Sequence, residues 1–242
     1  MSAGAPSFDF RLIDTPAGSL PCIVRGPLTG PQLLIIPPLF EEMNRTRALL
    51  AGIGRGLTER GIGSWLPDLP GTGDSDIPLT AVAWPDWRES IRAVSQYIAA
   101  THGKAPSSFS VRGGALLDDA AADADRMRLA PVTSGDRLLR ELLRIRVAAE
   151  QERGTPTSLA ALEDQLRSTT LELGGYPITP ALAAGLSAAR ASAIEPGRTA
   201  ALAGGVGDLM FEGPPVWRQA EPIGARALAD DLAAWIALCV GR

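Results

Sequence analysis

The pattern of apolar residues between Leu33 and Val132 limits the possible folds more than any other feature of the sequence. Short apolar runs alternate there with longer stretches whose apolar residues recur every three or four positions. The first pattern is typical of strands buried in a parallel sheet, and the second is typical of amphipathic helices. The expected elements are strand Leu33–Ile36, helix Leu49–Leu57, strand Ile62–Leu66, helix Pro85–Ile98, strand Ser108–Val111, a helix to about Asp125, and strand Met127–Val132. This order predicts an α/β fold with a mostly parallel sheet and helices on both faces.

Further segments flank this alternation. Phe8–Ile13 and Leu20–Arg25 are separated by turn residues, which predicts an N-terminal β-hairpin. Three helical patterns between residues 134 and 193 predict a helical cap inserted over one end of the sheet. The expected organisation is a core over residues 1–133, a cap over 134–193 and a shortened C-terminal part of the core over 194–242.

The C-terminal part contains a short connection. Only Gly204–Asp208 separates the strand candidates Thr199–Ala203 and Leu209–Phe211. Neighbouring parallel strands usually need a crossover of about a dozen residues or more. We therefore expect that these two strands are not parallel neighbours, and that a strand or a crossover helix is lost or shortened here.

Composition excludes several classes of function. The chain has 242 residues, 45% hydrophobic and 21% charged, with a net charge of -4, as is usual for a globular protein. It has no basic run that would bind nucleic acid, and no apolar run long enough to span a membrane. Residues 1–10 lack a signal-peptide pattern, and Cys22 and Cys239 lack zinc-site spacing. We therefore expect a cytoplasmic protein with reduced thiols and no metal or other cofactor.

Two turns and the place of the cap resemble the α/β-hydrolase superfamily. Residues 68–75 (DLPGTGDS) follow an expected strand and resemble the turn after the fourth strand of that superfamily. Residues 110–114 (SVRGG) stand where the superfamily has its nucleophile elbow, a strand–turn–helix that normally reads Gly-x-Ser-x-Gly. The resemblance implies an α/β-hydrolase fold with a cap after the sixth strand.

Longer segments are similar to the exosortase A system-associated hydrolases of type 2. The loop 37–45 (PPLFEEMNR) is the most specific of them. The others are 66–75 (LPDLPGTGDS), 111–117 (VRGGALL), 175–182 (GYPITPAL) and 213–217 (GPPVW). This resemblance implies a bacterial α/β hydrolase linked to exopolysaccharide and exosortase loci, and it supplies no substrate.

The residues needed by a serine hydrolase are not in their usual places. The third elbow position is Arg112, and a guanidinium stays protonated and cannot attack a carbonyl. The mechanism also needs a histidine after the last strand, whereas the single histidine, His102, precedes the elbow strand. We expect His102 to be a surface residue and Ser110 to supply a structural hydroxyl. The sequence thus predicts a degenerate Ser-His-Asp triad and no catalytic residue.

Charged clusters elsewhere favour structural interpretations. Asp68 and Asp74 are expected to brace a turn. The aspartates of 118–125 match no calcium-loop spacing, so they predict a solvated helix face. The arginines of 137–146 predict either a solvated cap helix or an anion-binding cap surface. Glycines at alternate positions of 52–56 are expected to allow close packing on the sheet.

Glu41 and Glu42 follow the third strand, in the loop that lies beside the elbow in this fold. Each can favour the start of the next helix, where negative charge is stabilising, or can pair with Arg112. Because a lone buried guanidinium is costly, we predict that Arg112 pairs with Glu41 or Glu42. The predicted pocket comprises Arg112, Glu41, Glu42, Phe40, Asn44, Val111, Gly113 and Trp217.

Three hypotheses about function follow. The leading one is a degenerate hydrolase that binds a small or acyl-type ligand under the cap without Ser-His-Asp catalysis. The second is an active hydrolase of ester-like substrates that uses carboxylate or water chemistry from Glu41 or Glu42. The third is a non-catalytic scaffold in exopolysaccharide assembly, with its oligomeric state open. An open pocket favours the first two, and a pocket filled by cap side chains beside an exposed apolar patch favours the third.

Overall fold

A computed structural model describes residues 8–121, 125–219 and 225–240. Its main sheet has eight strands in the order β1-β2-β4-β3-β5-β6-β9-β10. The strands are β1 (Phe8–Thr15), β2 (Gly18–Arg25), β3 (Gln32–Ile36), β4 (Gly63–Pro67), β5 (Ser107–Val111), β6 (Arg126–Leu129), β9 (Thr199–Leu202) and β10 (Leu209–Phe211). The β1–β2 and β2–β4 pairs are antiparallel and the other neighbours are parallel, so the predicted N-terminal hairpin and mostly parallel sheet are confirmed.

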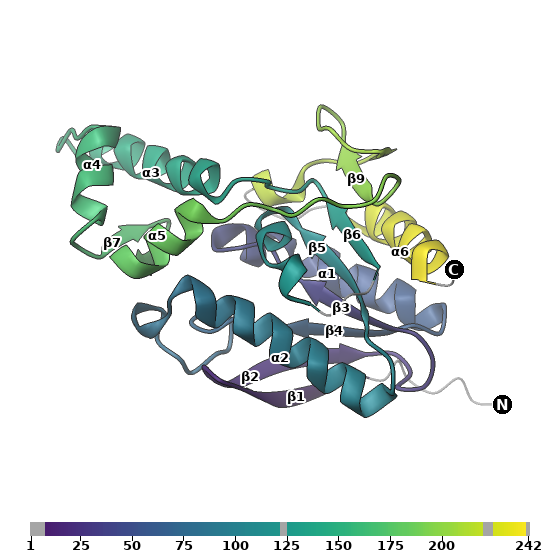
Figure 1. Ribbon diagram of the computed structural model, residues 1–242. Coiled ribbons are helices and arrows are strands. Elements are labelled where there is room, and N and C mark those ends of the chain that lie inside the picture. The colour runs from purple at the N-terminus through teal and green to yellow at the C-terminus, as the bar shows by residue number, and fades with distance from the viewer. Residues whose placement is uncertain (1–7, 122–124, 220–224, 241–242) are drawn as a thin grey trace.

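Helices cover both faces of this sheet (Figure 1). α1 (Glu41–Glu59) and α6 (Arg226–Val240) pack on one face, and α2 (Trp84–His102) packs on the other. Successive side chains of a strand point to opposite faces. On β3, Leu33 and Ile35 therefore join the core cluster under α1 and α6, whereas Leu34 and Ile36 join the cluster under α2. In the described part of the chain, no helix combines the length and the apolar character needed to cross a bilayer.

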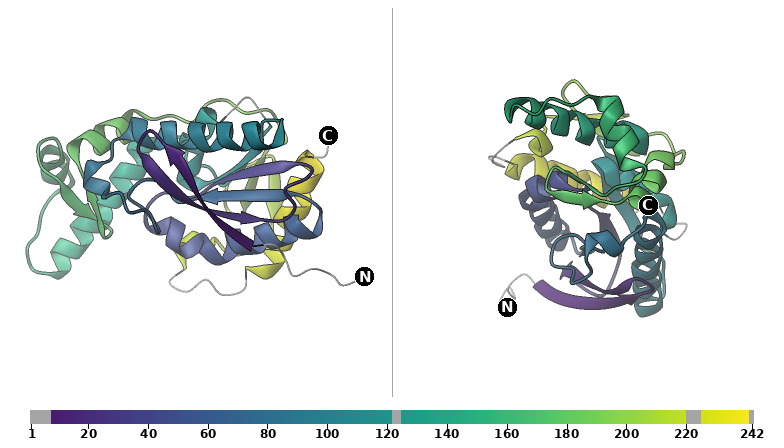
Figure 2. Two further views of the ribbon diagram at one scale, coloured as in Figure 1. Left: turned by 90° about the horizontal axis from the view of Figure 1, so that it is seen from below. Right: turned by 90° about the vertical axis from the view of Figure 1, so that its left-hand side faces the viewer.

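The segment between β6 and β9 forms the cap, which extends beyond one end of the sheet, at the left of Figure 1 and of the left view of Figure 2. Leu138 and Leu182 of the cap belong to the same core cluster as Trp87 of α2. The three predicted cap helices are present, while the separation of the cap from the core as a unit stays a prediction. The cap elements are α3 (Gly135–Glu152), α4 (Leu159–Leu166), β7 (Leu171–Leu173), β8 (Tyr176–Ile178) and α5 (Pro180–Ala188).

The helix predicted after β5 is wrong. Two short 3₁₀ turns, η2 (Arg112–Leu116) and η3 (Asp118–Ala120), occupy the described part of this segment. They bring Asp118 inward to Arg128 of β6, whose Nε donates to the Asp118 carboxylate at 2.6 Å. The side chains of this pair are 1% and 3% exposed. The pairing explains the departure from a regular helix, since a buried guanidinium requires a carboxylate partner.

The predicted solvated face of aspartates is therefore wrong for Asp118. Asp119 and Asp125 are nearer the surface, and each forms an ion pair, with Arg88 and Arg198 respectively. Asp123 lies outside the described residues.

The end of the sheet also differs from the sequence-based expectation. β9 and β10 are parallel neighbours, so the expectation that they could not be is wrong. No crossover helix lies between them, as predicted, and residues 203–208 return directly to the start of β9. There the backbone N–H of Asp208 donates to the Thr199 carbonyl at 2.8 Å, and the Asp208 carboxylate accepts from the Thr199 N–H at 3.1 Å. The return is possible because β9 has four residues and β10 has three.

Candidate functional site

The chain turns sharply at the carboxyl ends of β3 and β5. Arg112 has φ +52° and Phe40, just before α1, has φ +57°. Both values lie in the left-handed region that residues with a Cβ seldom adopt. Because β3 and β5 are parallel neighbours, the two turns meet at one edge of the sheet. Val111 lies in the core cluster under α1 and α6, so its side chain faces away from the cap.

The side chains of Arg112 and Glu42 form an ion pair. Arg112 Nε donates to the two carboxylate oxygens of Glu42 at 3.0 and 3.3 Å, and Nη2 lies 3.0 Å from Oε1. Nη1 donates to the Ala130 carbonyl at 3.2 Å, and the guanidinium carbon lies 5.1 Å from the ring centroid of Trp217. The two side chains of the pair are 14% and 19% exposed. The pair predicted between Arg112 and one of the two glutamates is therefore present, with Glu42.

Burial governs the electrostatics of Glu42. Loss of water contact raises its pKa above the ordinary value of 4.5, while the Arg112 guanidinium acts in the opposite direction. The charge of Glu141 on α3 raises this pKa further. Both carboxylate oxygens of Glu42 accept hydrogen bonds from Arg112. The elbow position that would hold a nucleophile is therefore occupied by an arginine whose charge is balanced by Glu42.

Glu41 has a different set of partners. Its carboxylate accepts from Arg45 Nε at 3.2 Å and from Asn44 Nδ2 at 3.3 Å, within the first turns of α1. A negative charge there is favoured by the helix dipole. Asn44 also donates to the hydroxyl of Tyr176 on β8 at 3.1 Å. Glu41 thus belongs to the start of α1, and Asn44 connects that helix to the cap.

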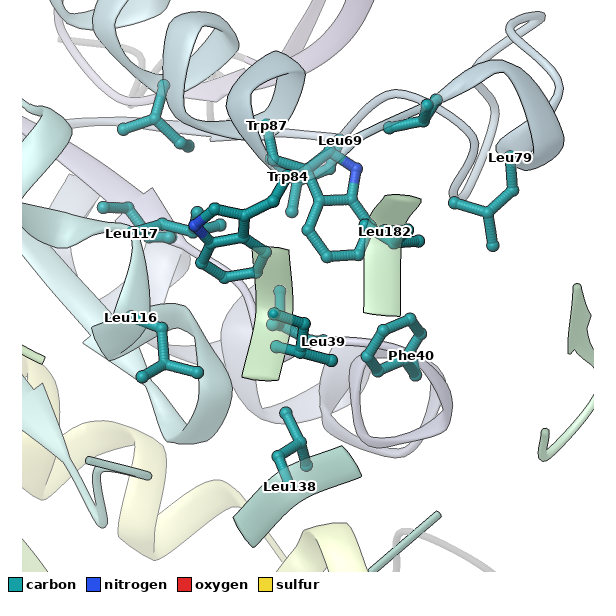
Figure 3. Close-up of a cluster of buried hydrophobic side chains, with 14 of the residues drawn as sticks. Leu39, Phe40, Leu69, Leu79, Trp84, Trp87, Leu116, Leu117, Leu138 and Leu182 are labelled. Carbon is teal, nitrogen blue, oxygen red and sulfur yellow. The ribbon is translucent and has the colours of Figure 1, made fainter. Parts of the chain in front are cut away.

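Buried apolar side chains of the core and the cap pack against the elbow at Gly113, and Figure 3 shows the cluster to which they belong. A Cβ at Gly113 would lie 3.0 Å from Cγ of Leu39 and 3.2 Å from Cδ2 of Leu138, so this approach of cap and core leaves no room for a larger residue. Phe40 packs against Trp87 with ring centroids 5.6 Å apart. In Figure 3 the labelled leucines of the core and the cap gather around these rings.

Two cavities lie beside this filled space. The first, the α1 cavity, measures about 320 Å³ and lies between the start of α1, α3 and η4 (Val216–Arg218). The second, the loop cavity, measures about 620 Å³ and is lined by Arg112 and by the segments after β6 and β9. Glu141 and Arg218 line both, so the cavities adjoin. The predicted residues that line the α1 cavity are Phe40, Glu41, Glu42 and Trp217. Those that line neither cavity are Asn44, Val111 and Gly113.

Known structures share this architecture. Est1E from Butyrivibrio proteoclasticus, solved with ferulic acid bound, is 12% identical over 96% of this chain and 100% of its own, with a TM-score of 0.65. A putative hydrolase from Agrobacterium vitis S4 is 16% identical over 98% and 99%, with a TM-score of 0.55. Smu.1393c from Streptococcus mutans is 14% identical over 98% of both chains, with a TM-score of 0.57.

The chain has the α/β-hydrolase fold. Identities this low show the fold alone, and the residues of the site decide what the protein does with it. No protein-family model and no curated protein matches the sequence.

Within this α/β-hydrolase fold, the described residues Ser110, His102 and Asp208 each have contacts of their own. Ser110 donates its hydroxyl to Asp118 at 2.9 Å inside the core, in keeping with a structural role. His102, the single histidine, ends α2 and lies edge-on to Trp65 with ring centroids 5.6 Å apart. It is half-buried, so its prediction as a plain surface residue is wrong. The only acid between β9 and β10, Asp208, bonds to the start of β9.

The other acidic turn of the α/β-hydrolase core is structural. Asp68 accepts a hydrogen bond from the backbone N–H of Asp74 at 2.9 Å, which is the turn brace predicted from the sequence. Among the described residues, no three His, Cys, Asp or Glu side chains are placed to hold a metal ion.

Sequence reasoning missed Glu141 and Arg218 of the loop cavity, although it named the arginines of 137–146 as a possible anion-binding surface. Glu141 lines it together with Arg137 and Arg144, and their spacing of four and three residues on one helix is a signal that could have identified a shared face. Arg218 carries no comparable signal, because its place depends on the path of the chain after β10. The pair of Asp118 and Arg128 was hidden by the prediction of a helix after β5.

Proposed function

We propose that this α/β-hydrolase-fold protein binds a small ligand at the carboxyl edge of its sheet and does not hydrolyse it by serine chemistry. The observation that carries this proposal is the ion pair of Arg112 and Glu42 at the elbow. A nucleophile at this turn would stand exposed above the sheet. Here a guanidinium, which cannot attack a carbonyl, is tied to a carboxylate and covered by Trp217.

The ligand site that we propose comprises the two adjoining cavities rather than the space above the elbow. Leu39, Phe40 and Leu138 occupy that space and also form one wall of the α1 cavity, so the open volume lies beside them, in the α1 cavity and the loop cavity. Leu142 and Ile145 of α3 line the α1 cavity and offer apolar surface for an acyl-type group. Sites that combine apolar walls with a few polar groups are typical of small-molecule binding.

The cellular setting is proposed on the sequence resemblance. The segments shared with exosortase A system-associated hydrolases of type 2 support a bacterial, cytoplasmic protein that serves exopolysaccharide production. The degenerate triad is part of the same proposal, because Arg112 replaces the nucleophile and the chain has a single histidine, placed at the end of α2.

Activity-based labelling tests the proposal. The purified protein should not react with a fluorophosphonate probe and should not cleave short p-nitrophenyl esters, beside an active serine hydrolase as the positive control. Stoichiometric labelling of any serine would overturn it. Ester cleavage that resists the probe and disappears in Glu42→Gln would instead support carboxylate chemistry, the alternative that the raised pKa of Glu42 favours.

A scaffold is the second candidate function, because cap side chains fill the space above the elbow while Val206 and Met210 are 93% and 57% exposed. β10 is the last strand of the sheet, and no described strand pairs with its outer edge. A second copy of the chain could pair there, since free edges readily accept a further strand. Light scattering that shows a dimer in the parent and a monomer in Met210→Lys would support this function.

A further inference from the structure

We propose that the loop cavity is a site for a polyvalent oxyanion, a small molecule with two or more negative charges on phosphate or carboxylate groups. The inference rests on the proposed function, because it names the class of ligand for the same edge of the sheet. The cavity lies outside the carboxyl ends of β6 and β9, where open α/β sheets generally bind ligands.

Three arginines that form no ion pair with another described residue line this cavity. Arg137 and Arg144 of α3 and Arg218 of η4 all contribute to its walls. Within the described part of the chain, none of the three guanidinium groups has a carboxylate partner. Two other arginines of α3 show the contrast, because Arg140 lies 3.3 Å from Glu163 and Arg146 lies 2.6 Å from Glu150. The arginines of α3 that line the cavity are therefore the ones without an ion pair among the described residues.

The charges of the lining residues favour a ligand with more than one negative charge. Three arginines and one glutamate, Glu141, leave a net two positive charges, while the charge of Arg112 is balanced by Glu42. Arg137, Glu141 and Arg144 follow a helical spacing, so one face of α3 presents them together. Guanidinium groups match phosphate and carboxylate through paired hydrogen bonds.

The form of the cavity indicates a molecule larger than a single phosphate ion. Its volume of about 620 Å³ lies within the usual range for small-molecule sites. In the wall after β9, Gly204 and Gly205 contribute backbone alone, and Val206 contributes a side chain that is 93% exposed. The direct return from β9 to β10 leaves this wall without a crossover helix. The ligand can therefore extend over the loop or towards the adjoining α1 cavity.

Titration calorimetry at low ionic strength tests the site with two probes, inorganic pyrophosphate and citrate, which separate phosphate from carboxylate preference. The cavity variant is Arg137→Gln with Arg144→Gln. The matched control is Arg140→Gln with Arg153→Gln, which removes the same charge from α3 and from the residue that follows it, at positions 50% and 66% exposed. We expect at least one probe to bind the parent and the control alike, and to bind the cavity variant at least tenfold more weakly.

Two results would overturn the site: failure of both probes to bind the parent, or equal weakening in the cavity and control variants, which would indicate general charge attraction. Circular dichroism checks that the variants fold, and Arg218→Gln, on a different element, gives an independent loss if the double variant does not fold. Failure of the anion probes with no fluorophosphonate labelling removes only this inference. Labelling of a serine removes the proposed function whatever the probes bind.

Discussion

At the scale of single residues, the Arg112–Glu42 pair can be compared with a second arginine–glutamate pair at the start of α1. Arg112→Met leaves Glu42 buried without its partner and should lower the free energy of unfolding by about 3 kcal/mol. Arg45→Met removes the partner of Glu41, but those side chains are 35% and 45% exposed. That loss should stay below about 1 kcal/mol. Urea unfolding at neutral pH measures both, and equal costs would show that the elbow pair is no more than a surface contact.

The same variant has an expected pH dependence. The folded-state pKa of Glu42 is raised, so the folded protein binds this proton more readily than the unfolded chain does. Its contribution to stability is therefore fully present below its unfolded pKa, near 4.5, and is lost as pH rises through the folded pKa. Without Arg112 the folded pKa should rise further, because the larger of the two opposing charges is gone and only that of Arg218 remains. The cost of Arg112→Met should thus shrink between neutral and mildly acidic pH, and a cost that grows on acidification would contradict this assignment.

Asp118 gives a second prediction at this scale. Asp118→Asn removes the charge that balances Arg128 in a site where both side chains are at most 3% exposed, so a loss of about 3–5 kcal/mol is expected. Asp119→Asn is the matched control, because the adjacent residue pairs with Arg88 where the side chains are 34% and 30% exposed. Its cost should be about 1 kcal/mol or less. Thermal unfolding of the two variants side by side provides the measurement, and similar melting temperatures would count against a buried pair.

The two charged pairs also show what sequence could and could not predict. The partner of Arg112 could be inferred, because parallel neighbours bring the turns after β3 and β5 together whatever their details. The partner of Asp118 could not, because ten residues and an unexpected pair of 3₁₀ turns separate it from Arg128. The sequence predicts a helix there, whereas the burial of Arg128 in the sheet favours a carboxylate that turns inward.

At the scale of elements, the glycines of α1 serve two different neighbours. A Cβ at Gly56 would lie 2.8 Å from the Cβ of Ala233, and one at Gly52 would lie 2.7 Å from that of Ala229, both on α6. A Cβ at Gly54 would instead meet Cδ of the Arg25 side chain at 2.9 Å, on the sheet. The close packing on the sheet expected from the sequence therefore applies to Gly54, and the other two glycines let the helices approach each other.

This division predicts opposite effects for the same substitution. Alanine favours a helix over glycine by about 1 kcal/mol, whereas overpacking a tight contact costs about 1–3 kcal/mol. Gly56→Ala should therefore destabilise the protein by about 1–2 kcal/mol, because α1 and α6 must separate. Gly54→Ala should be neutral or mildly stabilising, since an arginine side chain can move aside. Urea midpoints for the two variants test this, and a more stable Gly56→Ala would show that the helices have room to spare.

The central strands of the sheet follow from local sequence patterns, whereas the pairing of β9 with β10 does not. The alternation of strands and helices predicts the central strands and their succession along the chain, because apolar runs and helical periodicity are local signals. β9 and β10 are an exception to the usual crossover length for parallel neighbours, because only residues 203–208 connect them. Strands of three and four residues are short enough for the chain to return along β9 without one.

At the scale of the whole molecule, the cap and the core share buried side chains. The cluster that contains Trp87 of α2 also contains Leu142 of α3 and Leu186 of α5. A Cβ at Gly185 of α5 would lie 2.3 Å from the Cβ of Trp84, so the cap meets α2 at very short range. The chain also enters and leaves the cap side by side, because Ser134 and Arg190 form an antiparallel bridge. A cap attached in this way should unfold together with the core, although the sequence alone predicts only an insertion over one end of the sheet.

Leu142→Ala tests this coupling, with Leu232→Ala of α6 as a control in the core cluster on the opposite face of the sheet. Each change should cost about 2–5 kcal/mol, as is usual for buried leucine. If the molecule unfolds as one unit, circular dichroism, which reports the helices, and tryptophan fluorescence should give coincident urea transitions in both variants. A loss of helix that precedes the fluorescence change in Leu142→Ala, but not in Leu232→Ala, would show that the cap unfolds separately. The loop cavity lies between the cap helix α3 and the segments after β6 and β9, so a coupled cap would hold Arg137 and Arg144 in fixed positions opposite Arg218.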